Sequence, residues 1–455
     1  MRARTLAEIA AAIGGTLGGG ADASAVVSSV ATDSRSLESG SLFVAIRGAR
    51  VDGHAFVDAA MRGGASAAVV TRPVDAPHVE VDDTVLALLA LARDERRRTS
   101  DVRVVAVTGA NGKTSTKDLA AAVLSTRYRT HASPASFNNE IGLPMTLLGA
   151  ADDVEVIIAE MGARRVGDVT LLCDVARPDA AVVTNVGVAH MEIFGSWDRI
   201  VASSAEPLEA LGPSSVAIVN ADDPVTPDLV SRTRASVLRF GVHPSADVRA
   251  EAVELDSAGR AAFALVHGEE REALALSVPG EHMVSNALAA AACGVVLGVP
   301  LAESASALKG ARIARWRMET FTTADGVVVV NDAYNANPES MAAGLRAARW
   351  IARDGRLAAV LGHMAELGPI AAEEHERLGE LVVRVRVDRL ITVGTQAEAI
   401  ARAAVREGQR PADVVAVADA DEAVADVRSW ARRGDVVLVK GSRVVALERV
   451  AEALR

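Results

Sequence analysis

Short apolar runs alternate with longer amphipathic stretches through the central part of the chain. Four of these runs lie between Val102 and about Ala311, in the segments RVVAVTG, VEVIIAEMG, DAAVVTNVG and SSVAIVNADD. Each run is rich in β-branched residues and has the length of a strand, while the stretches between them show helical spacing. Strands that are covered by helices on both faces read as continuous apolar runs. The pattern therefore predicts a mostly parallel sheet in this region.

A second alternation of the same kind begins after Arg317, in the segments GVVVVNDAY, RLAAVLG, DRLITVG and DVVLVKGS. Four strands with intervening helices predict a separate doubly wound, Rossmann-like domain. The pattern before residue 98 is different, because short strands at Ser41–Ile46 and Ala67–Val70 flank a helical segment from His54 to Arg62. That arrangement is typical of a small α/β domain.

A polar, arginine-rich stretch, ARDERRRTSDVR, indicates a boundary near residue 98. We therefore expect an α/β protein of three domains, residues 1–98, 99–313 and 314–455. A chain of 455 residues is too long for one ordinary hydrophobic core, which agrees with this division.

The composition is that of a globular protein, with 50% hydrophobic and 24% charged residues and a net charge of −11. This charge argues against general binding to nucleic acid or to a membrane surface, although single loops can still bind small anions. Arginine has displaced lysine almost everywhere. The only lysines of the chain are Lys113, Lys117, Lys309 and Lys440.

Cys173 and Cys293 both lie in apolar surroundings, so we expect buried thiols in a reducing compartment. The N-terminus lacks the apolar core of a signal peptide. The apolar stretch from Ala287 to Ala302 is short and predicts a buried helix rather than a membrane span. We expect a cytoplasmic monomer.

The segment VAVTGANGKTST carries the clearest chemical signal. A β-branched strand ends at Gly109, and a helix is predicted to begin near Lys113. Backbone N–H groups of such a loop converge on a phosphate, where Lys113 would reach the β- and γ-phosphates and the Thr114 hydroxyl would bind Mg²⁺. The usual eight-residue phosphate-binding pattern, GxxxxGK[ST], begins with glycine, and Val107 occupies that first position here. The competing interpretation is a purely structural turn between a strand and a helix.

Two further side chains follow predicted strands at their carboxyl ends. Glu160 ends the strand in VEVIIAEMG, and His190 comes after the strand in DAAVVTNVG. Open α/β sheets place ligands at this edge, and Mg²⁺ takes few protein oxygens beside those of a nucleotide. Glu160 is therefore a candidate Mg²⁺ ligand, and His190 a candidate metal or phosphate ligand. The structural alternatives are a helix cap for Glu160 and a packed side chain for His190.

A series of motifs in fixed order resembles the Mur ligases, the ATP-dependent amide-forming enzymes of peptidoglycan synthesis. In chain order they are TGANGKTSTK, SFNNEIGLPMTLL, EMGARRVGDV, TNVGVAHMEIFGS, NADDP, GEHMVSNALAAAA, NDAYNANPESM, VLGHMAELG and VLVKGSR. The resemblance covers essentially the whole chain, and the family's shorter TGxxGK[ST] loop accounts for Val107. FNN, YNANP and MAELG look most like the branch that adds D-alanyl-D-alanine to a UDP-N-acetylmuramoyl-tripeptide.

This resemblance implies an ADP-forming carboxylate–amine ligase that works through an acyl phosphate. It implies that the first domain binds the UDP precursor, the second binds ATP and the third binds the incoming amine. Lys113, Glu160 and His190 would be the catalytic residues. Thr114 and Glu160 would hold a first Mg²⁺, and Glu160 with His190 would hold a second.

The other implied contacts fall into two groups. The nucleotide would be held by Thr108, Gly109, Asn111, Gly112, Lys113, Thr114, Ser115, Arg317 and Asp332, with His282 and Asn286 on the adenine side. The substrates would be held by Thr32, Asp33, Ser34 and Arg35 at the UDP-sugar, Asn138 and Asn139 at the peptide, and Tyr334, Asn335, Asn337 and Pro338 at D-alanyl-D-alanine.

The chain departs from the family pattern at two positions. The helix after FGS normally carries a lysine that is carbamylated and binds the second Mg²⁺, and its place falls on Ser204. Serine cannot carry a carbamate, so a bound anion, water or Glu206 would have to complete the site, or the second Mg²⁺ would be weak and the enzyme slow. Pro207 would interrupt the same helix. His363 stands where the family usually has aspartate.

These departures leave three functions open. The first is a ligase for D-alanyl-D-alanine. The second keeps the chemistry but uses a different amine or acyl donor in a specialised pathway. The third is a non-catalytic paralogue that binds a nucleotide without turnover.

Overall fold

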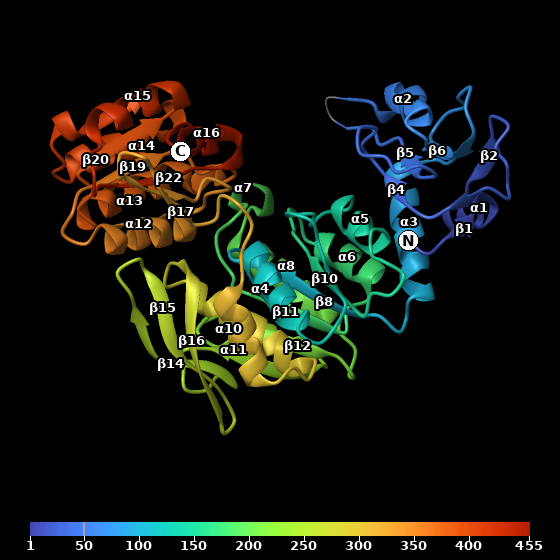
Figure 1. Ribbon diagram of the computed structural model, residues 1–455, viewed down its shortest axis with the longest axis horizontal. Coiled ribbons are helices and arrows are strands. Elements are labelled where there is room, and N and C mark those ends of the chain that lie inside the picture. The colour runs from blue at the N-terminus through green and yellow to red at the C-terminus, as the bar shows by residue number, and fades with distance from the viewer. Residues whose placement is uncertain (49–50) are drawn as a thin grey trace.

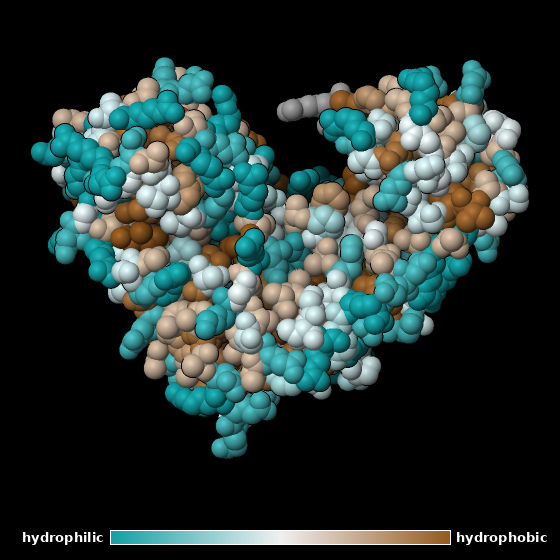
Figure 2. Space-filling view, viewed as in Figure 1, coloured by the Kyte–Doolittle hydropathy of each residue, from teal (hydrophilic) through white to brown (hydrophobic). Residues whose placement is uncertain are grey.

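The computed structural model describes residues 1–48 and 51–455, which fold into three lobes in chain order (Figure 1). The N-terminal lobe lies at the right of the view and the C-terminal lobe at the left, with the middle lobe between and below them. Figure 2 shows the surface hollowed between the two outer lobes, above the middle lobe. Every lobe combines helices with strands, so the expected α/β class is confirmed.

The N-terminal lobe contains a five-stranded sheet with the strand order β2-β7-β6-β5-β4. The strand expected at Ala67–Val70 is β6, and the one expected at Ser41–Ile46 is the shorter β5. The helix expected from His54 begins as a 3-10 turn and becomes α-helical at Val57. The elements are β1 (Arg4–Thr5), α1 (Leu6–Ile13), β2 (Thr16–Gly18), β3 (Val26–Val27), β4 (Val30–Ala31), β5 (Leu42–Val44), η1 (Gly53–Phe56), α2 (Val57–Arg62), β6 (Ala67–Val70), β7 (His78–Glu80) and α3 (Thr84–Arg98).

The middle lobe contains a nine-stranded sheet ordered β16-β15-β14-β13-β12-β11-β8-β10-β9. Its elements are β8 (Arg103–Thr108), α4 (Lys113–Leu124), β9 (Thr130–Ala132), α5 (Gly142–Leu148), β10 (Val156–Glu160), α6 (Asp168–Ala176), β11 (Ala180–Val183), α7 (Met191–Phe194), α8 (Trp197–Glu209), β12 (Val216–Asn220), α9 (Thr226–Ser231), β13 (Ser236–Gly241), β14 (Val248–Leu255), β15 (Arg260–His267), β16 (Glu270–Pro279), α10 (Met283–Val296) and α11 (Leu301–Gly310). Neighbouring strands from β9 to β14 are parallel, which confirms the mostly parallel sheet. The antiparallel extension through β15 and β16 was not predicted.

Strand β8 shows how this sheet is buried. Alternate side chains of a strand point to opposite faces. Val105 and Val107 pack with α4, α10 and α11 on one face, whereas Val104 and Ala106 pack with α3, α5, α6 and α8 on the other. The carboxyl end of β8, where the glycine loop begins, is thereby held by cores on both sides.

Two expectations about helices are wrong. The stretch from Ala287 to Ala302 is not one helix, because α10 ends at Val296 and α11 begins at Leu301. Gly298 separates them with a φ of +75°, a conformation that favours glycine. Pro207 does not interrupt α8, which continues to Glu209; the proline lacks only its own N–H donor, and the Ala210 N–H beyond it still bonds the Glu206 carbonyl.

The C-terminal lobe contains a six-stranded sheet ordered β17-β18-β22-β19-β20-β21, parallel except for the β17–β18 pair. All four strands expected from the sequence are present, as β18, β19, β20 and β22. The elements are β17 (Glu319–Thr322), β18 (Val328–Asn331), α12 (Pro338–Ala352), β19 (Leu357–Leu361), η2 (Gly368–Ile370), α13 (Ala371–Arg384), β20 (Arg389–Val393), η3 (Thr395–Ala397), α14 (Glu398–Arg406), η4 (Pro411–Asp413), β21 (Val414–Val417), α15 (Ala420–Trp430), β22 (Val436–Lys440), η5 (Arg443–Val445) and α16 (Glu448–Ala453).

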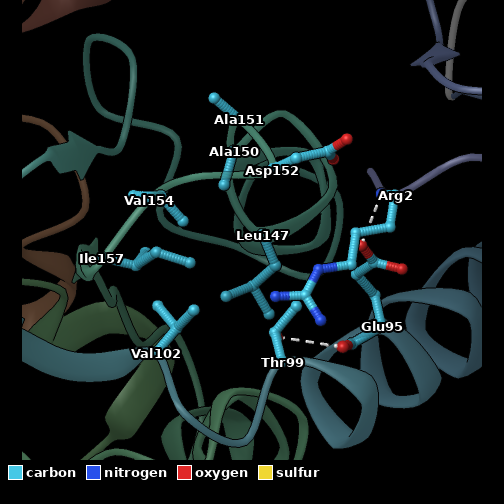
Figure 3. Close-up of a pocket in the computed structure, with 10 residues that line it drawn as sticks. All are labelled: Arg2, Glu95, Thr99, Val102, Leu147, Ala150, Ala151, Asp152, Val154 and Ile157. Atoms are coloured by element: carbon cyan, nitrogen blue, oxygen red, sulfur yellow. Dashed lines mark hydrogen bonds between the residues drawn. The ribbon is translucent and has the colours of Figure 1, made fainter.

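The N-terminal and middle lobes share one continuous hydrophobic core, which runs from Leu6 in α1 to Ile157 in β10. Figure 3 shows the polar side of their junction, where the Arg2 backbone N–H donates to Glu95 Oε1 at 2.7 Å. The crevice there has a volume of about 10 Å³. That is room for about one water molecule. This crevice is therefore too small for a ligand, whereas a larger hollow of about 390 Å³ lies at the same junction, between residues 28–41 of the N-terminal lobe and residues 148–152 of the middle lobe.

Cys173 and Cys293 are both buried, as expected, and burial raises the pKa of each thiol to about 12. Thiols with such a high pKa are unreactive near neutral pH. Among the residues that the structure describes, no helix has the length and apolar character needed to cross a bilayer.

Candidate active site

The glycine loop lies between β8 and α4, at the carboxyl edge of the middle sheet. Gly109 has a φ of +126°, and a Cβ there would lie 2.1 Å from Thr184 Oγ1. The Thr184 hydroxyl donates to the Asn111 carbonyl at 2.6 Å, and the Asn111 N–H donates to Asn185 Oδ1 at 2.9 Å. The end of the neighbouring strand β11 therefore fixes the loop in a shape that leaves no room for larger residues.

If the loop binds ATP, as the sequence resemblance implies, replacing Gly112 with alanine is expected to raise the KM for ATP by about 10- to 100-fold. Gly112 has a φ of +80°, and a Cβ would lie 2.2 Å from Asn286 Oδ1. The left-handed strain costs about 1–2 kcal/mol, and the clash must also displace the loop. Initial rates at varied ATP concentration measure the effect.

Gly298→Ala is the matched control, because Gly298 has a φ of +75° and a Cβ added there would meet nothing within 4 Å. It carries the same backbone strain far along the chain from the loop. An equal rise of the KM for ATP in both variants would show that the shape of the loop is not the cause.

Lys113 begins α4 and folds back over the loop. Its Nζ donates to the Gly109 carbonyl at 2.6 Å and to the Ala110 carbonyl at 3.2 Å. Burial lowers the pKa of Lys113, the charge of Glu160 raises it, and the charge of Arg317 lowers it again. A phosphate bound at the loop would therefore face the positive charges of Lys113 and Arg317.

Glu160 ends β10 and is only 1% exposed. Its Oε1 accepts from Asn138 Nδ2 at 2.9 Å, whereas its Oε2 is buried without a hydrogen-bond partner. A buried carboxylate oxygen without a partner is costly, and a bound cation would satisfy it. The nearby loop supplies the buried Thr114 hydroxyl, so the donor set is oxygen-rich and suits Mg²⁺. Within residues 1–48 and 51–455 no three His, Cys, Asp or Glu side chains form a ready metal cage.

His190 precedes α7 and adopts a φ of +61°, which is uncommon for a residue other than glycine. Its Nδ1 pairs with the carboxylate of Glu366, which belongs to the C-terminal lobe. Burial and the charge of Lys113 lower the pKa of His190, and Glu366 raises it. The imidazole therefore lies between the glycine loop and the C-terminal lobe.

The C-terminal lobe reaches the glycine loop through two further side chains. Arg317 Nη2 donates to Thr114 Oγ1 at 2.8 Å, and its guanidinium lies 4.2 Å from the centre of the Tyr334 ring. Asn337 caps α12 and donates from Nδ2 to Asn111 Oδ1 at 2.7 Å. Residues from two lobes thus converge on the loop.

Asp332 and Lys440 form a buried ion pair behind these residues. Lys440 is 3% exposed at its side chain, and its Nζ lies 2.5 Å from Asp332 Oδ2. The other oxygen of Asp332 accepts from the Met318 N–H at 3.1 Å. The pair connects the strand ends of β18 and β22 with the segment that carries Arg317.

Comparison with known proteins identifies the family. Residues 26–100 match "Mur ligase family, catalytic domain", residues 107–294 match "Mur ligase middle domain", and residues 316–443 match "Mur ligase, glutamate ligase domain". A UDP-N-acetylmuramoyl-tripeptide–D-alanyl-D-alanine ligase of Mycobacterium tuberculosis is 40% identical over 99% of this chain and 97% of its own. The chain belongs to the Mur ligase family.

Solved structures agree with this assignment. MurF from Acinetobacter baumannii is 30% identical and superimposes with a TM-score of 0.90, over 99% of this chain and 98% of its own. MurF of Thermotoga maritima in complex with ADP is 30% identical, with a TM-score of 0.82 over 94% of this chain and 96% of its own. This Mur ligase therefore has the three-domain fold of MurF.

Several residues expected to touch ligands have structural contacts in this Mur ligase. Asn286 is buried and lies against the Thr116 hydroxyl beneath the glycine loop. Asn139 Oδ1 accepts the N–H groups of Ile141 and Gly142 at the start of α5. Pro338 is the first residue of α12.

The remaining expected residues differ in exposure and place. Thr108 and Ser115 are buried in the loop region, whereas His282 and Asn335 are exposed. The turn from Thr32 to Arg35 lies in the N-terminal lobe, away from the glycine loop (Figure 1). There Arg35 pairs with Asp33 at 2.7 Å, and its hydrogen bonds lower the pKa of Asp33 to about 2.

The structure also places the residues around the family's absent lysine. The Ser204 hydroxyl donates to the Ile200 carbonyl within α8 at 2.8 Å. Both oxygens of Glu206 are engaged at the start of α6, where they accept the N–H groups of Gly167 at 2.6 Å and Thr170 at 2.8 Å. Glu206 therefore caps the start of α6, and its completion of a metal site stays a prediction.

Sequence reasoning missed several residues that shape the site. Ser136 Oγ lies 3.0 Å from Thr114 Oγ1. The buried Lys117 donates to the carbonyls of Ser133 at 2.7 Å and Ala135 at 2.9 Å, which holds the Ser136 segment against the loop. The scarcity of lysine was a signal that could have drawn attention to Lys117.

In this Mur ligase the buried His375 of α13 supports the segment that carries Glu366. Its Nε2 accepts the Met364 N–H at 2.9 Å, and its Nδ1 donates to the Ala371 carbonyl at 2.6 Å. The bond from the Met364 N–H requires the neutral imidazole, because a protonated Nε2 cannot accept it. Burial lowers the pKa of His375 below its ordinary 6.5, and the Ala371 carbonyl and Glu374 partly offset this. Burial and the charge of the nearby His375 also lower the pKa of His363.

We expect the C-terminal lobe to lose stability below about pH 6.5, because the unfolded chain then binds a proton at His375 that the folded chain excludes. His375→Gln retains an acceptor for the Met364 N–H but cannot titrate, so its melting temperature should fall less between pH 7.5 and 5.5. Differential scanning calorimetry measures this. Replacing the exposed His243 with glutamine should leave the wild-type pH dependence, and equal slopes for wild type and His375→Gln would contradict the argument.

Proposed function

We propose that the chain is the ATP-dependent ligase that joins D-alanyl-D-alanine to a UDP-N-acetylmuramoyl-tripeptide. The observation that carries the proposal is the meeting of the glycine loop with Arg317 and Asn337 of the C-terminal lobe. A phosphate-binding loop faces a second lobe there, as required when a phosphorylated intermediate must meet a second substrate. Relatives bearing this ligase name cover nearly the whole chain.

The chemistry follows from the weakness of a carboxylate as an electrophile. A carboxylate oxygen of the peptide attacks the γ-phosphorus of ATP, the bond to ADP breaks, and an acyl phosphate forms. The amine then attacks the carbonyl carbon, phosphate leaves with the C–O electron pair, and the nitrogen loses a proton. Binding and charge stabilisation account for most of such catalysis.

The chain's own residues divide these tasks. The loop N–H groups and Lys113 bind the phosphates and offset the repulsion between the γ-phosphate and the attacking carboxylate. Arg317 adds positive charge from the C-terminal lobe beside Thr114. Thr114 and Glu160 would hold a first Mg²⁺, and Glu160 with His190 would hold a second, and bound Mg²⁺ would further neutralise phosphate charge.

The substrates are assigned to the three domains. Residues 1–98 bind the UDP precursor through Thr32–Arg35, residues 99–313 bind ATP, and residues 314–455 bind the dipeptide. Asn138 meets the peptide, and Tyr334 lies at the dipeptide. We place the enzyme in the cytoplasm as a monomer.

Purified protein with ATP, Mg²⁺ and the UDP-N-acetylmuramoyl-tripeptide should release ADP only when D-alanyl-D-alanine is added. ADP release with another amine, and none with the dipeptide, would replace this function with a ligase of different specificity. Nucleotide binding without turnover with any amine would indicate a non-catalytic protein.

A further inference from the structure

Glu366 lies in the segment between β19 and η2 and contacts the middle lobe at two points. Its carboxylate pairs with His190 Nδ1, and its carbonyl accepts the Glu192 N–H at 3.1 Å. The approach is close, because a Cβ on Gly368 would lie 2.8 Å from Glu192 Cα. This part of the C-terminal lobe is therefore seated on the start of α7.

Both partners hold uncommon backbone conformations. His190 and Glu366 each have a φ of +61°. Such conformations persist only where the surrounding structure imposes them, and they cluster at functional sites. Here two of them meet across one interface.

The contact determines which nitrogen of His190 is free. A carboxylate accepts, so Nδ1 carries the proton, and Nε2 is left with its lone pair. In the described part of the chain, Nε2 of His190 makes no hydrogen bond. Histidines that bind metals usually donate their other ring N–H to a carboxylate in this way, which fixes the ring and its tautomer.

The segment that carries Glu366 is tied to its own lobe. The Ala365 N–H donates to Ser442 Oγ at 2.8 Å, and the Met364 N–H donates to His375 at 2.9 Å. Glu366 therefore moves with the C-terminal lobe as a body.

We propose that Glu366 is a positioning residue that orients His190 for metal binding, so that docking of the C-terminal lobe completes the metal site of the middle lobe. The inference rests on the proposed function for the presence of Mg²⁺. On this proposal, the metal affinity of the middle lobe depends on Glu366, a residue of the C-terminal lobe to which the amine substrate is assigned.

The test measures Mn²⁺ binding to the full chain with ADP, by electron paramagnetic resonance of free Mn²⁺, and the Mg²⁺ concentration at half-maximal rate. Glu366→Ala should weaken metal binding at the His190 site by about 10- to 100-fold. Glu366→Gln, which keeps a hydrogen-bond acceptor for His190 Nδ1, should lose less metal affinity than Glu366→Ala. Because Glu366 acts through His190, the double variant His190→Ala with Glu366→Ala should bind metal no more weakly than His190→Ala alone.

Glu339→Ala is the matched control, because Glu339 also belongs to the C-terminal lobe and accepts the Val188 N–H at 3.3 Å, in the same segment as His190. Its metal affinity should stay within twofold of wild type. Wild-type Mn²⁺ affinity in Glu366→Ala, an equal loss in Glu339→Ala, or a changed KM for the dipeptide alone would each overturn the inference. Binding is measured without acyl acceptor or amine, so a wild-type protein that fails to ligate the dipeptide would refute the proposed function separately.

Discussion

Lys113→Ala is expected to lower dipeptide-dependent ADP formation by about 10³-fold, the loss seen when one preorganised electrostatic group is removed from an active site. Lys113 is the only lysine in the glycine loop, and its ammonium is already held there by the Gly109 and Ala110 carbonyls. The thermal stability of the free protein should not fall. Burial lowers the pKa of Lys113, so its charge opposes folding until a phosphate arrives.

Two measurements separate a catalytic loss from unfolding. ATP should raise the melting temperature of the wild-type protein clearly and that of Lys113→Ala much less. Lys309→Ala removes an exposed lysine at the end of α11 and should retain both activity and the ATP-dependent shift. Activity within tenfold of wild type in Lys113→Ala would contradict the assignment of the loop.

Lys440→Met is expected to destabilise the C-terminal lobe by about 3–5 kcal/mol, because it leaves the carboxylate of Asp332 largely buried without its partner. For a lobe of this size the loss corresponds to a fall of roughly 10 °C in the melting temperature. Calorimetry should show the change in the transition of the C-terminal lobe. Ligase activity should fall as well, since Asp332 also holds the segment that carries Arg317.

The double variant Lys440→Met with Asp332→Asn removes both charges and should recover most of the lost stability. On the proposed role of Asp332 at the nucleotide, it should not recover activity, because an amide replaces the carboxylate. A double variant as unstable as Lys440→Met would show that packing of the lysine stem, rather than the ion pair, accounts for the effect.

The parts of the fold that were predictable are those specified locally. Continuous apolar runs give the strands of both parallel sheets, and the Gly-Lys-Thr triplet at a strand end gives the loop and the start of α4 at Lys113. The antiparallel β14–β16 extension was missed because its strands alternate in burial instead of forming continuous apolar runs, and because the two-residue turn at Gly268 and Glu269 between β15 and β16 was overlooked. The end of α10 at Val296 depends on Gly298, a helix-ending signal that the apolar run around it obscured.

The site was predictable only in part, for a physical reason. Glu160 ends β10, and Lys113 and Thr114 begin the helix that follows the neighbouring strand β8, so the sheet brings them together. Glu366 is separated from His190 by 176 residues and reaches it only through the docking of two lobes. No periodicity or spacing encodes such a contact. The cap formed by Glu206 was hidden for the same reason, because its partners belong to another helix.

The shared core of the N-terminal and middle lobes has a consequence for the phosphorylation step. One uninterrupted packing of side chains, from Leu6 to Ile157, makes these two lobes a single rigid platform. On the proposed assignment of substrates, the acyl donor and ATP are mounted on that platform at a fixed separation, while the amine arrives on the third lobe. The phosphorylation step then needs no large motion between its two reactants, because both are bound to lobes that share one core.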